Sequence, residues 1–289
     1  MKFGVREPER LGAVRLEDGR QLGWAQWGPE DGTPVLFFSG SAMGRSLGFG
    51  GDVLGRLGVR LISVDRPGLG SSDADPERSL TDWAADVSQL VDGLGLTGAR
   101  GVGFSHGAPF TLVCAAAGVL SAAAVVSGLD ELSRPELAPL LDPDVAELVR
   151  LAAADPAAFE VSFTSHADAD MLWGVIERFS PQRDMEIYAH PAFEPAYRRS
   201  LTEGFSQGAA GYARDLTLAY RPWPFDVADI TVPVDLWYGG HDPGSVHSPD
   251  HGATLAARIP KARRHVIPDS GGAILWTHAE DILRTLLAR

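Results

Sequence analysis

The stretch Gly103-Phe104-Ser105-His106-Gly107 follows a short apolar run and precedes a run of small residues. A strand that turns abruptly into a helix needs glycine on both sides of its central residue, because the two backbones nearly touch there. Such a turn exposes the hydroxyl of Ser105 and aims the backbone amide of His106 at a developing oxyanion. The stretch therefore predicts a serine nucleophile at the junction of a strand and a helix.

Strand-like and helix-like segments alternate on both sides of this turn. Runs with the character of strands occupy residues 34–38, 59–64, 101–104, 122–126, 234–238 and 264–267. Segments with the character of helices occupy residues 79–94, 108–120, 254–259 and 274–287. This alternation predicts an α/β fold with a mostly parallel central sheet that helices cover on both faces.

The character of the chain changes between residues 131 and 228. Helical and loop-like stretches punctuated by prolines replace the alternation, and aromatic residues are frequent. The alternation resumes afterwards, so residues 1–130 and 229–289 are predicted to form the core and residues 131–228 an inserted helical cap. Phe163 and Trp173 of this segment are expected to line a substrate pocket between the cap and the sheet.

The composition fits one enzyme-sized unit of 289 residues with a formal net charge of −13. This charge argues against nucleic acid or an anionic membrane as a partner, because both require clustered lysine and arginine. The single cysteine, Cys114, excludes an intramolecular disulfide, and residues 1–20 lack the apolar stretch of a secretion signal. With no run of 18 apolar residues, the chain is expected to be soluble and cytoplasmic.

Together these features resemble the α/β-hydrolase superfamily, and they match best its branch of proline iminopeptidases and haloperoxidases. Besides the turn at Ser105, five stretches carry the resemblance: Phe37-Phe38-Ser39-Gly40-Ser41, Asp65-Arg66-Pro67-Gly68-Leu69-Gly70-Ser71-Ser72, Trp223-Pro224-Phe225-Asp226, Ile230-Thr231-Val232-Pro233-Val234 and Leu236-Trp237-Tyr238-Gly239-Gly240-His241-Asp242. The resemblance covers nearly the whole chain. It implies acyl transfer through Ser105, with Asp242 as the acid of a catalytic triad.

The resemblance also implies how the rest of the site is built. The amides of Ser41 and His106 would form the oxyanion hole, and Gly40 would contact the substrate. No organic cofactor is implied. No pair of histidines has the spacing of metal ligands beside a carboxylate, so no metal is expected.

The chain departs from this family where the catalytic histidine is expected. Family members have Gly-His followed by apolar residues, whereas this chain reads Gly271-Gly272-Ala273-Ile274. The resemblance therefore places the histidine position at Gly272 and predicts a gap the size of an imidazole between Ser105 and Asp242. Without an imidazole to remove its proton, a serine hydroxyl is a poor nucleophile near neutral pH. His278 matches a separate, non-catalytic histidine of the family.

His247 lies five residues after Asp242 on the same loop. Loop histidines are ordinarily solvated, but this one could reach the mouth of the pocket and contact a substrate there. Covalent catalysis with an unrecognised base such as His247 would be inferred only if Ser105 proved essential and Asp242 dispensable.

A vacant base position is compatible with three kinds of protein. The first is a serine hydrolase, inactive or impaired in this form because the histidine is lost by engineering or naturally. The second is a non-hydrolytic enzyme of the same fold, such as a cyclase or lyase of small-molecule biosynthesis, and the third is a ligand-binding pseudoenzyme. The hydrolase is the leading interpretation. Its expected substrate is a small or medium apolar ester, lactone or amide, because residues 131–228 are rich in aromatic residues and poor in lysine.

Overall fold

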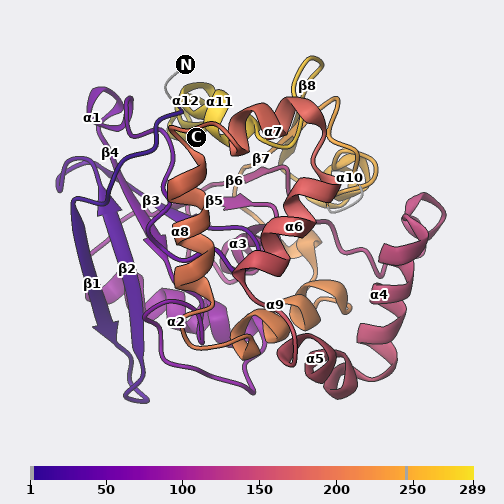
Figure 1. Cartoon of the computed structure of the whole chain (residues 1–289). Helices are drawn as coiled ribbons and strands as arrows, with labels where there is room; N and C mark the ends of the chain where they lie inside the picture. Colours follow the sequence, from indigo (N-terminus) through magenta and orange to yellow (C-terminus); the bar gives the residue numbers. More distant parts are fainter. Residues whose placement is uncertain (1–2, 245–246) are drawn as a thin grey trace.

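The computed structural model describes residues 3–244 and 247–289, which form a central sheet with helices on both of its faces (Figure 1). The strands are β1 (Arg10–Arg15), β2 (Gln21–Trp27), β3 (Thr33–Phe38), β4 (Val59–Val64), β5 (Arg100–Phe104), β6 (Ala123–Val126), β7 (Val234–Gly239) and β8 (Ala262–Ile267). Their order in the sheet is β1-β2-β4-β3-β5-β6-β7-β8. β2 pairs antiparallel with β1 and with β4, and the other neighbouring strands pair in parallel. The predicted mostly parallel sheet is confirmed.

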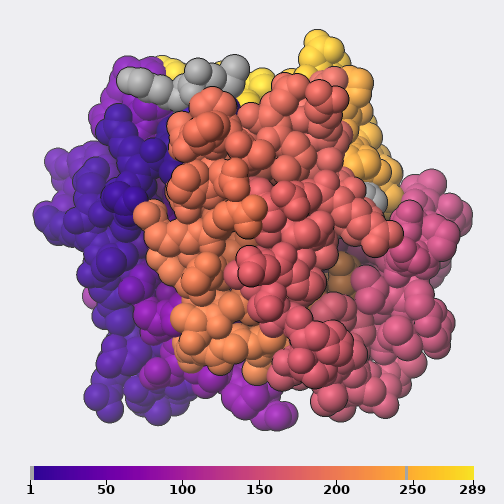
Figure 2. Space-filling view, in the orientation of Figure 1, coloured from indigo at the N-terminus to yellow at the C-terminus, as the bar shows by residue number. Residues whose placement is uncertain are grey.

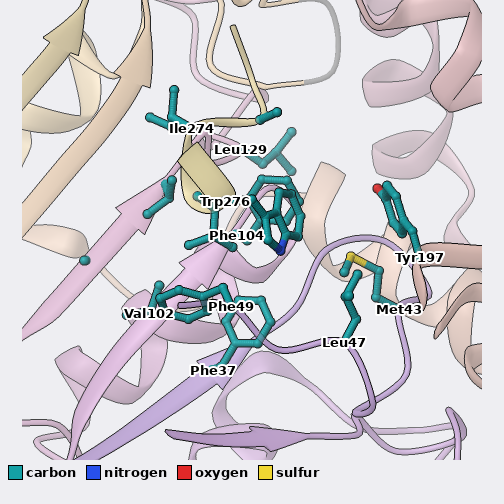
Figure 3. Close-up of a cluster of buried hydrophobic side chains, with 14 of the residues drawn as sticks. Phe37, Met43, Leu47, Phe49, Val102, Phe104, Leu129, Tyr197, Ile274 and Trp276 are labelled. Carbon is teal, nitrogen blue, oxygen red and sulfur yellow. The ribbon is translucent and has the colours of Figure 1, made fainter. Parts of the chain in front are cut away.

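The inner strands of the sheet are buried on both faces. Successive side chains of a strand point to opposite faces, so Phe37 and Phe38 of β3 belong to two different hydrophobic cores. Phe37 packs edge-on against Phe49 with ring centroids 5.1 Å apart (Figure 3). Phe38 packs against Trp83 on the opposite face, with ring centroids 5.7 Å apart. Because each face presents an apolar surface, helices cover the sheet from both sides.

The helices that flank the sheet divide between these two cores. α2 (Leu80–Gly93), α3 (Gly107–Ala116) and α10 (Ala253–Arg258) contribute to the core around Phe38. α1 (Leu54–Leu57), α11 (Ile274–Thr277) and α12 (Ala279–Leu287) contribute to the core around Phe37. None of the helices in the described part of the chain is long and apolar enough to cross a membrane.

Six α-helices follow one another between β6 and β7. They are α4 (Pro143–Ala154), α5 (Pro156–Thr164), α6 (Ala169–Phe179), α7 (Gln182–Tyr188), α8 (Glu194–Gly204) and α9 (Ala210–Tyr220), with the short 3-10 helices η1 (Ala138–Leu140) before them and η2 (Val227–Asp229) after them. Their apolar side chains, Trp173 and Tyr197 among them, join the core around Phe37. Figure 2 shows residues of this segment, coloured pink to orange, over most of one face of the molecule. These helices lie within residues 131–228, the range of the expected cap.

Candidate active site

Ser105 lies between β5 and α3, at the strand–helix junction that the sequence predicts. Its φ angle of 52° is in the left-handed region, which residues with a Cβ seldom adopt. A Cβ at Gly103 would collide with the hydroxyl of Thr111, and one at Gly107 would collide with the carbonyl of Phe38. Both glycines are therefore required for the close approach of strand and helix around the serine.

The imidazole of His247 lies between Ser105 and Asp242. Its Nδ1 is 2.7 Å from Oδ2 of Asp242, and its Nε2 is 3.1 Å from Oγ of Ser105. Because an ionised carboxylate only accepts hydrogen bonds, Nδ1 of His247 carries a proton, and in the neutral ring Nε2 accepts from the Ser105 hydroxyl. The prediction of a gap between Ser105 and Asp242 is therefore wrong, since a histidine from another position fills that space.

His247 reaches this place because the chain after β7 folds back over the end of the sheet. Gly244 takes a φ angle of 67° and donates its amide to Oδ1 of Asp242 at 3.3 Å. The amide of Ser248 donates to the carbonyl of Gly128 at 3.0 Å, which ties the loop to the chain that follows β6. Both flanks of His247 are thus anchored over the ends of two neighbouring strands.

Gly272 lies beside the ring of His247. A Cβ at Gly272 would be 3.1 Å from Cε1 of His247 and 3.3 Å from Oδ2 of Asp242. A Cβ at Gly271 would collide with the carboxylate of Asp184. The two glycines therefore make room for an imidazole and a carboxylate that come from other elements. The prediction that Gly272 leaves the histidine position empty is therefore wrong, because His247 occupies the space beside Gly272.

Asp184 of α7 is a buried acid for which the sequence carries no recognisable signal. Its carboxylate accepts hydrogen bonds from the amides of Gly272 at 2.7 Å and Ala273 at 3.1 Å. A carboxylate that binds backbone amides far along the chain has no characteristic spacing, so no motif could have identified it. Through these two bonds α7 holds the loop that passes beside His247.

The surrounding charges favour the protonated form of His247. Burial disfavours the imidazolium, but the charge of Asp242 and its hydrogen bond outweigh burial and raise the pKa of His247, and the charge of Asp184 acts in the same direction. Burial also opposes ionisation of Asp242, but His247 and the amide of Gly244 lower the pKa of this carboxyl group. Burial raises the pKa of Asp184, against the effect of its two amide hydrogen bonds.

Ser41 and His106, the residues expected to provide the oxyanion hole, lie together beside Ser105. Oγ of Ser41 is 2.6 Å from Nδ1 of His106, and both residues border the same pocket as Ser105. Burial lowers the pKa of His106 to about 3, and the charge of Arg66 acts in the same direction. The imidazole of His106 is therefore neutral near pH 7.

Arg66 holds the loop that follows β3. Its buried guanidinium donates to the carbonyls of Ser39 at 2.7 Å and Gly40 at 2.8 Å, and to the carboxylate of Asp215 at 2.6 Å. In a trans peptide the carbonyl and the following amide point in opposite directions. The hydrogen bond to Gly40 therefore directs the amide of Ser41 away from Arg66.

A pocket of about 130 Å³ opens beside Ser105. Gly40 and His247, the other expected substrate contacts, also border this pocket. The helices between β6 and β7 supply the opposite wall through aliphatic side chains and the four tyrosines Tyr188, Tyr197, Tyr212 and Tyr220. The pocket thus lies between the sheet and the helical segment.

Phe163 and Trp173 do not border this pocket, so the prediction that both line it is wrong. The ring of Phe163 packs against Tyr212 with centroids 6.2 Å apart, and the ring of Trp173 packs against Tyr197 with centroids 5.8 Å apart. Both aromatic residues therefore support the pocket wall from behind. Helical periodicity does not show which aromatic side chain of a segment faces a cavity.

Comparison of the sequence with known protein families identifies the family of this chain. A model of the alpha/beta hydrolase family matches residues 35–285. The chain belongs to the alpha/beta hydrolase family. Over 100 residues, this alpha/beta hydrolase is 36% identical to a non-heme chloroperoxidase of Streptomyces lividans. That match covers 34% of the chain and 36% of the chloroperoxidase, so it spans little more than a third of the curated relative's length.

Solved structures resemble this alpha/beta hydrolase over nearly its whole length. A hydrolase from Pseudomonas aeruginosa has a TM-score of 0.71 at 17% identity and covers 97% of this chain and 98% of its own. An esterase from Exiguobacterium antarcticum has a TM-score of 0.68 at 20% identity, with coverages of 96% and 97%. A bromoperoxidase from Bacillus anthracis has a TM-score of 0.66 at 17% identity, with coverages of 96% and 99%. The expected α/β-hydrolase fold is confirmed.

Proposed function

We propose that this alpha/beta hydrolase cleaves small esters, lactones or amides through Ser105, with His247 as general base and Asp242 as the acid that orients it. The observation that carries the proposal is the continuous hydrogen-bonded series from Ser105 through His247 to Asp242. The alternatives of a non-hydrolytic enzyme and a pseudoenzyme both depend on a vacant base position, which His247 fills. Neither is therefore proposed.

The series supports covalent acyl transfer in two steps. In the first, Oγ of Ser105 attacks the substrate carbonyl carbon while Nε2 of His247 takes the hydroxyl proton. The tetrahedral intermediate collapses as His247 returns that proton to the leaving group, which leaves an acyl ester on Ser105. In the second step, water attacks the ester while His247 takes a proton from it. His247 then gives this proton to Oγ of Ser105 as the acyl–oxygen bond breaks, which releases the acid and restores the serine. Asp242 stays ionised, accepts a hydrogen bond from Nδ1–H of His247 throughout, and stabilises the transient imidazolium.

The negative oxygen of each tetrahedral intermediate needs donors that are already oriented. The backbone amides of Ser41 and His106 are proposed to serve as these donors, because both residues border the pocket beside Ser105. Arg66 supports the first donor by holding the carbonyl of Gly40, which turns the Ser41 amide to the opposite side. We also propose that helices α4–α9 act as a cap, since three of them, α7, α8 and α9, supply tyrosines to the pocket wall.

Labelling with a fluorophosphonate tests the assignment of the nucleophile. Such a reagent forms a phosphorus–oxygen bond with an activated serine and releases fluoride. We expect one equivalent to attach, and peptide mass spectrometry to place it on Ser105. Ser105→Ala should remain unlabelled and inactive on p-nitrophenyl esters, although its fold and thermal unfolding are unchanged. Ester hydrolysis that persists in Ser105→Ala, or a label on another serine, would contradict the proposal.

The pH dependence of kcat/KM provides a second test. Protonated His247 cannot accept the serine proton, so activity should fall on the acid side with a midpoint above the ordinary imidazole pKa of about 6.5. Asp184→Asn removes a negative charge that favours the imidazolium, so its midpoint should lie at lower pH than that of the unmodified protein. At high pH this variant should retain activity within about tenfold, because Oδ1 of the asparagine can still accept one of the two amide hydrogen bonds and neither bond involves a reacting atom.

Asp281→Asn is the matched control for this measurement, since it removes the same charge from an exposed position on α12. The pH at which its kcat/KM falls to half on the acid side (the acid limb) should equal that of the unmodified protein. An acid limb that is identical in Asp184→Asn and the unmodified protein would show that Asp184 does not act on His247.

A further inference from the structure

The tyrosines of this chain are distributed unevenly. The sequence contains five, and four of them (Tyr188, Tyr197, Tyr212 and Tyr220) border the pocket beside Ser105. They come from α7, α8 and α9, so three separate helices converge to place them there. The rings of Tyr188 and Tyr197 pack edge-on with centroids 5.3 Å apart, and Tyr220 packs edge-on against His106 at 5.6 Å.

The fifth tyrosine shows what a purely structural tyrosine does in this protein. Tyr238 of β7 is fully buried, and its hydroxyl donates to the carbonyl of Gly128 at 3.1 Å. A buried tyrosine hydroxyl ordinarily finds such a partner. In contrast, none of the four pocket hydroxyls forms a hydrogen bond within residues 3–244 and 247–289, and none is among the fully buried polar atoms that lack a partner, so each is accessible to water or to a ligand. Their partners are therefore to be sought in whatever occupies the pocket.

The electrostatics of the pocket restrict the charge of that occupant. Its described wall contains no lysine, arginine, aspartate or glutamate. Burial raises the pKa of all four tyrosines, so their hydroxyls stay protonated and able to donate. Nε2 of His106, which is buried without a partner, belongs to a neutral ring on the same wall. Apart from His247, whose charge is balanced by its partner Asp242, the pocket thus presents uncharged hydrogen-bonding groups and would bind an uncharged ligand.

The size and the remaining lining restrict the ligand further. The volume of about 130 Å³ is comparable to a cavity that holds benzene, so the bound group has roughly six non-hydrogen atoms. Leu172, Ile176 and Leu216 provide apolar surface beside the hydroxyls. A compact carbon skeleton that carries oxygen atoms satisfies both kinds of surface, whereas a plain hydrocarbon would leave the hydroxyls unpaired.

We infer that the four tyrosine hydroxyls form an oxygen-binding subsite, and that the preferred acyl group is compact, uncharged and substituted with ether, keto or hydroxyl oxygen. This inference rests on the proposed hydrolase function and narrows it, because an apolar ester is expected from the sequence alone. The subsite would discriminate by hydrogen bonding in the transition state as well as by shape.

Matched pairs of p-nitrophenyl esters test the subsite. Methoxyacetate differs from butanoate by an oxygen in place of one methylene, and tetrahydrofuran-2-carboxylate differs from cyclopentanecarboxylate in the same way. After division by the rate of hydroxide-catalysed hydrolysis, we expect the oxygenated member of at least one pair to have a kcat/KM about tenfold higher or more. Single Tyr→Phe substitutions at 188, 197, 212 and 220 should reduce this preference about three- to tenfold at the positions that bind the oxygen.

Tyr238→Phe is the matched control, because it removes a hydroxyl that is bonded within the protein. It should leave the preference unchanged, whatever it does to stability. The inference is overturned if neither pair shows a preference, or if the preference survives in all four pocket variants. Hydrolysis of both members of a pair by Ser105→Ala would instead overturn the proposed function, so the two failures are distinguishable.

Discussion

Replacement of His247 by alanine is expected to lower kcat for p-nitrophenyl ester hydrolysis by at least about 10⁴-fold. The reason is that Nε2 of His247, at 3.1 Å, is the nitrogen that accepts the proton of Ser105. Without it the hydroxyl attacks unassisted, and only binding and the oxyanion hole continue to contribute. Imidazole added to the buffer should restore part of the activity of His247→Gly, since that substitution empties the space between Ser105 and Asp242.

His278→Ala is the control for this prediction. His278 lies at the junction of α11 and α12, and its ring contacts the hydroxyl of Thr277 at 2.9 Å. We expect its kcat to stay within about threefold of the unmodified value, as for a surface substitution. Thermal unfolding of both variants establishes that the comparison is between folded proteins. A His247→Ala protein that is folded and fully active would exclude His247 as the base.

Introduction of histidine at position 272 is expected to have opposite effects in two backgrounds. In the unmodified protein, Gly272→His should lower kcat/KM by about 10²-fold. A Cβ at this position would be 3.1 Å from Cε1 of His247 and 3.3 Å from Oδ2 of Asp242, so the new side chain displaces the ring of His247. A displacement of about 1 Å in a catalytic group lowers the rate by about 10²-fold. In the His247→Ala background, the same substitution should raise activity, because the displaced ring is absent and a new imidazole can approach Asp242.

Gly272→Ala separates crowding from new chemistry, since it adds only the Cβ. It should lower activity in the unmodified protein less than Gly272→His does, and it should restore nothing in the His247→Ala background. The measurement is kcat/KM for one ester across the four combinations of residues 247 and 272, with Gly272→Ala added to each background. If Gly272→His increased activity in the unmodified protein, the position would be a true vacancy and His247 would not be the base.

Local sequence patterns determined the elements whose formation depends on near neighbours. The glycines at 103 and 107 predict the turn at Ser105, because such a junction has no room for a Cβ at either position; in this structure an added Cβ would collide with Thr111 or with Phe38. Apolar runs predict the parallel strands, because a strand buried on both faces excludes polar residues. The role of Asp242 is instead what the resemblance to the α/β-hydrolase superfamily implies, and the structure places this residue shortly after the end of β7.

The tertiary structure alone decided which histidine contacts Ser105 and which side chains surround it. The position of His247 depends on the path of the loop after β7. A hydrogen bond from the amide of Ser248 to the carbonyl of Gly128 anchors this loop, and the absence of a side chain at Gly272 leaves room for the imidazole. Asp184 and the four pocket tyrosines depend on how α7, α8 and α9 pack over the sheet. Helical periodicity predicts that such helices form, but their orientation follows from contacts between segments far apart along the chain. A pattern within one segment carries no information about those contacts.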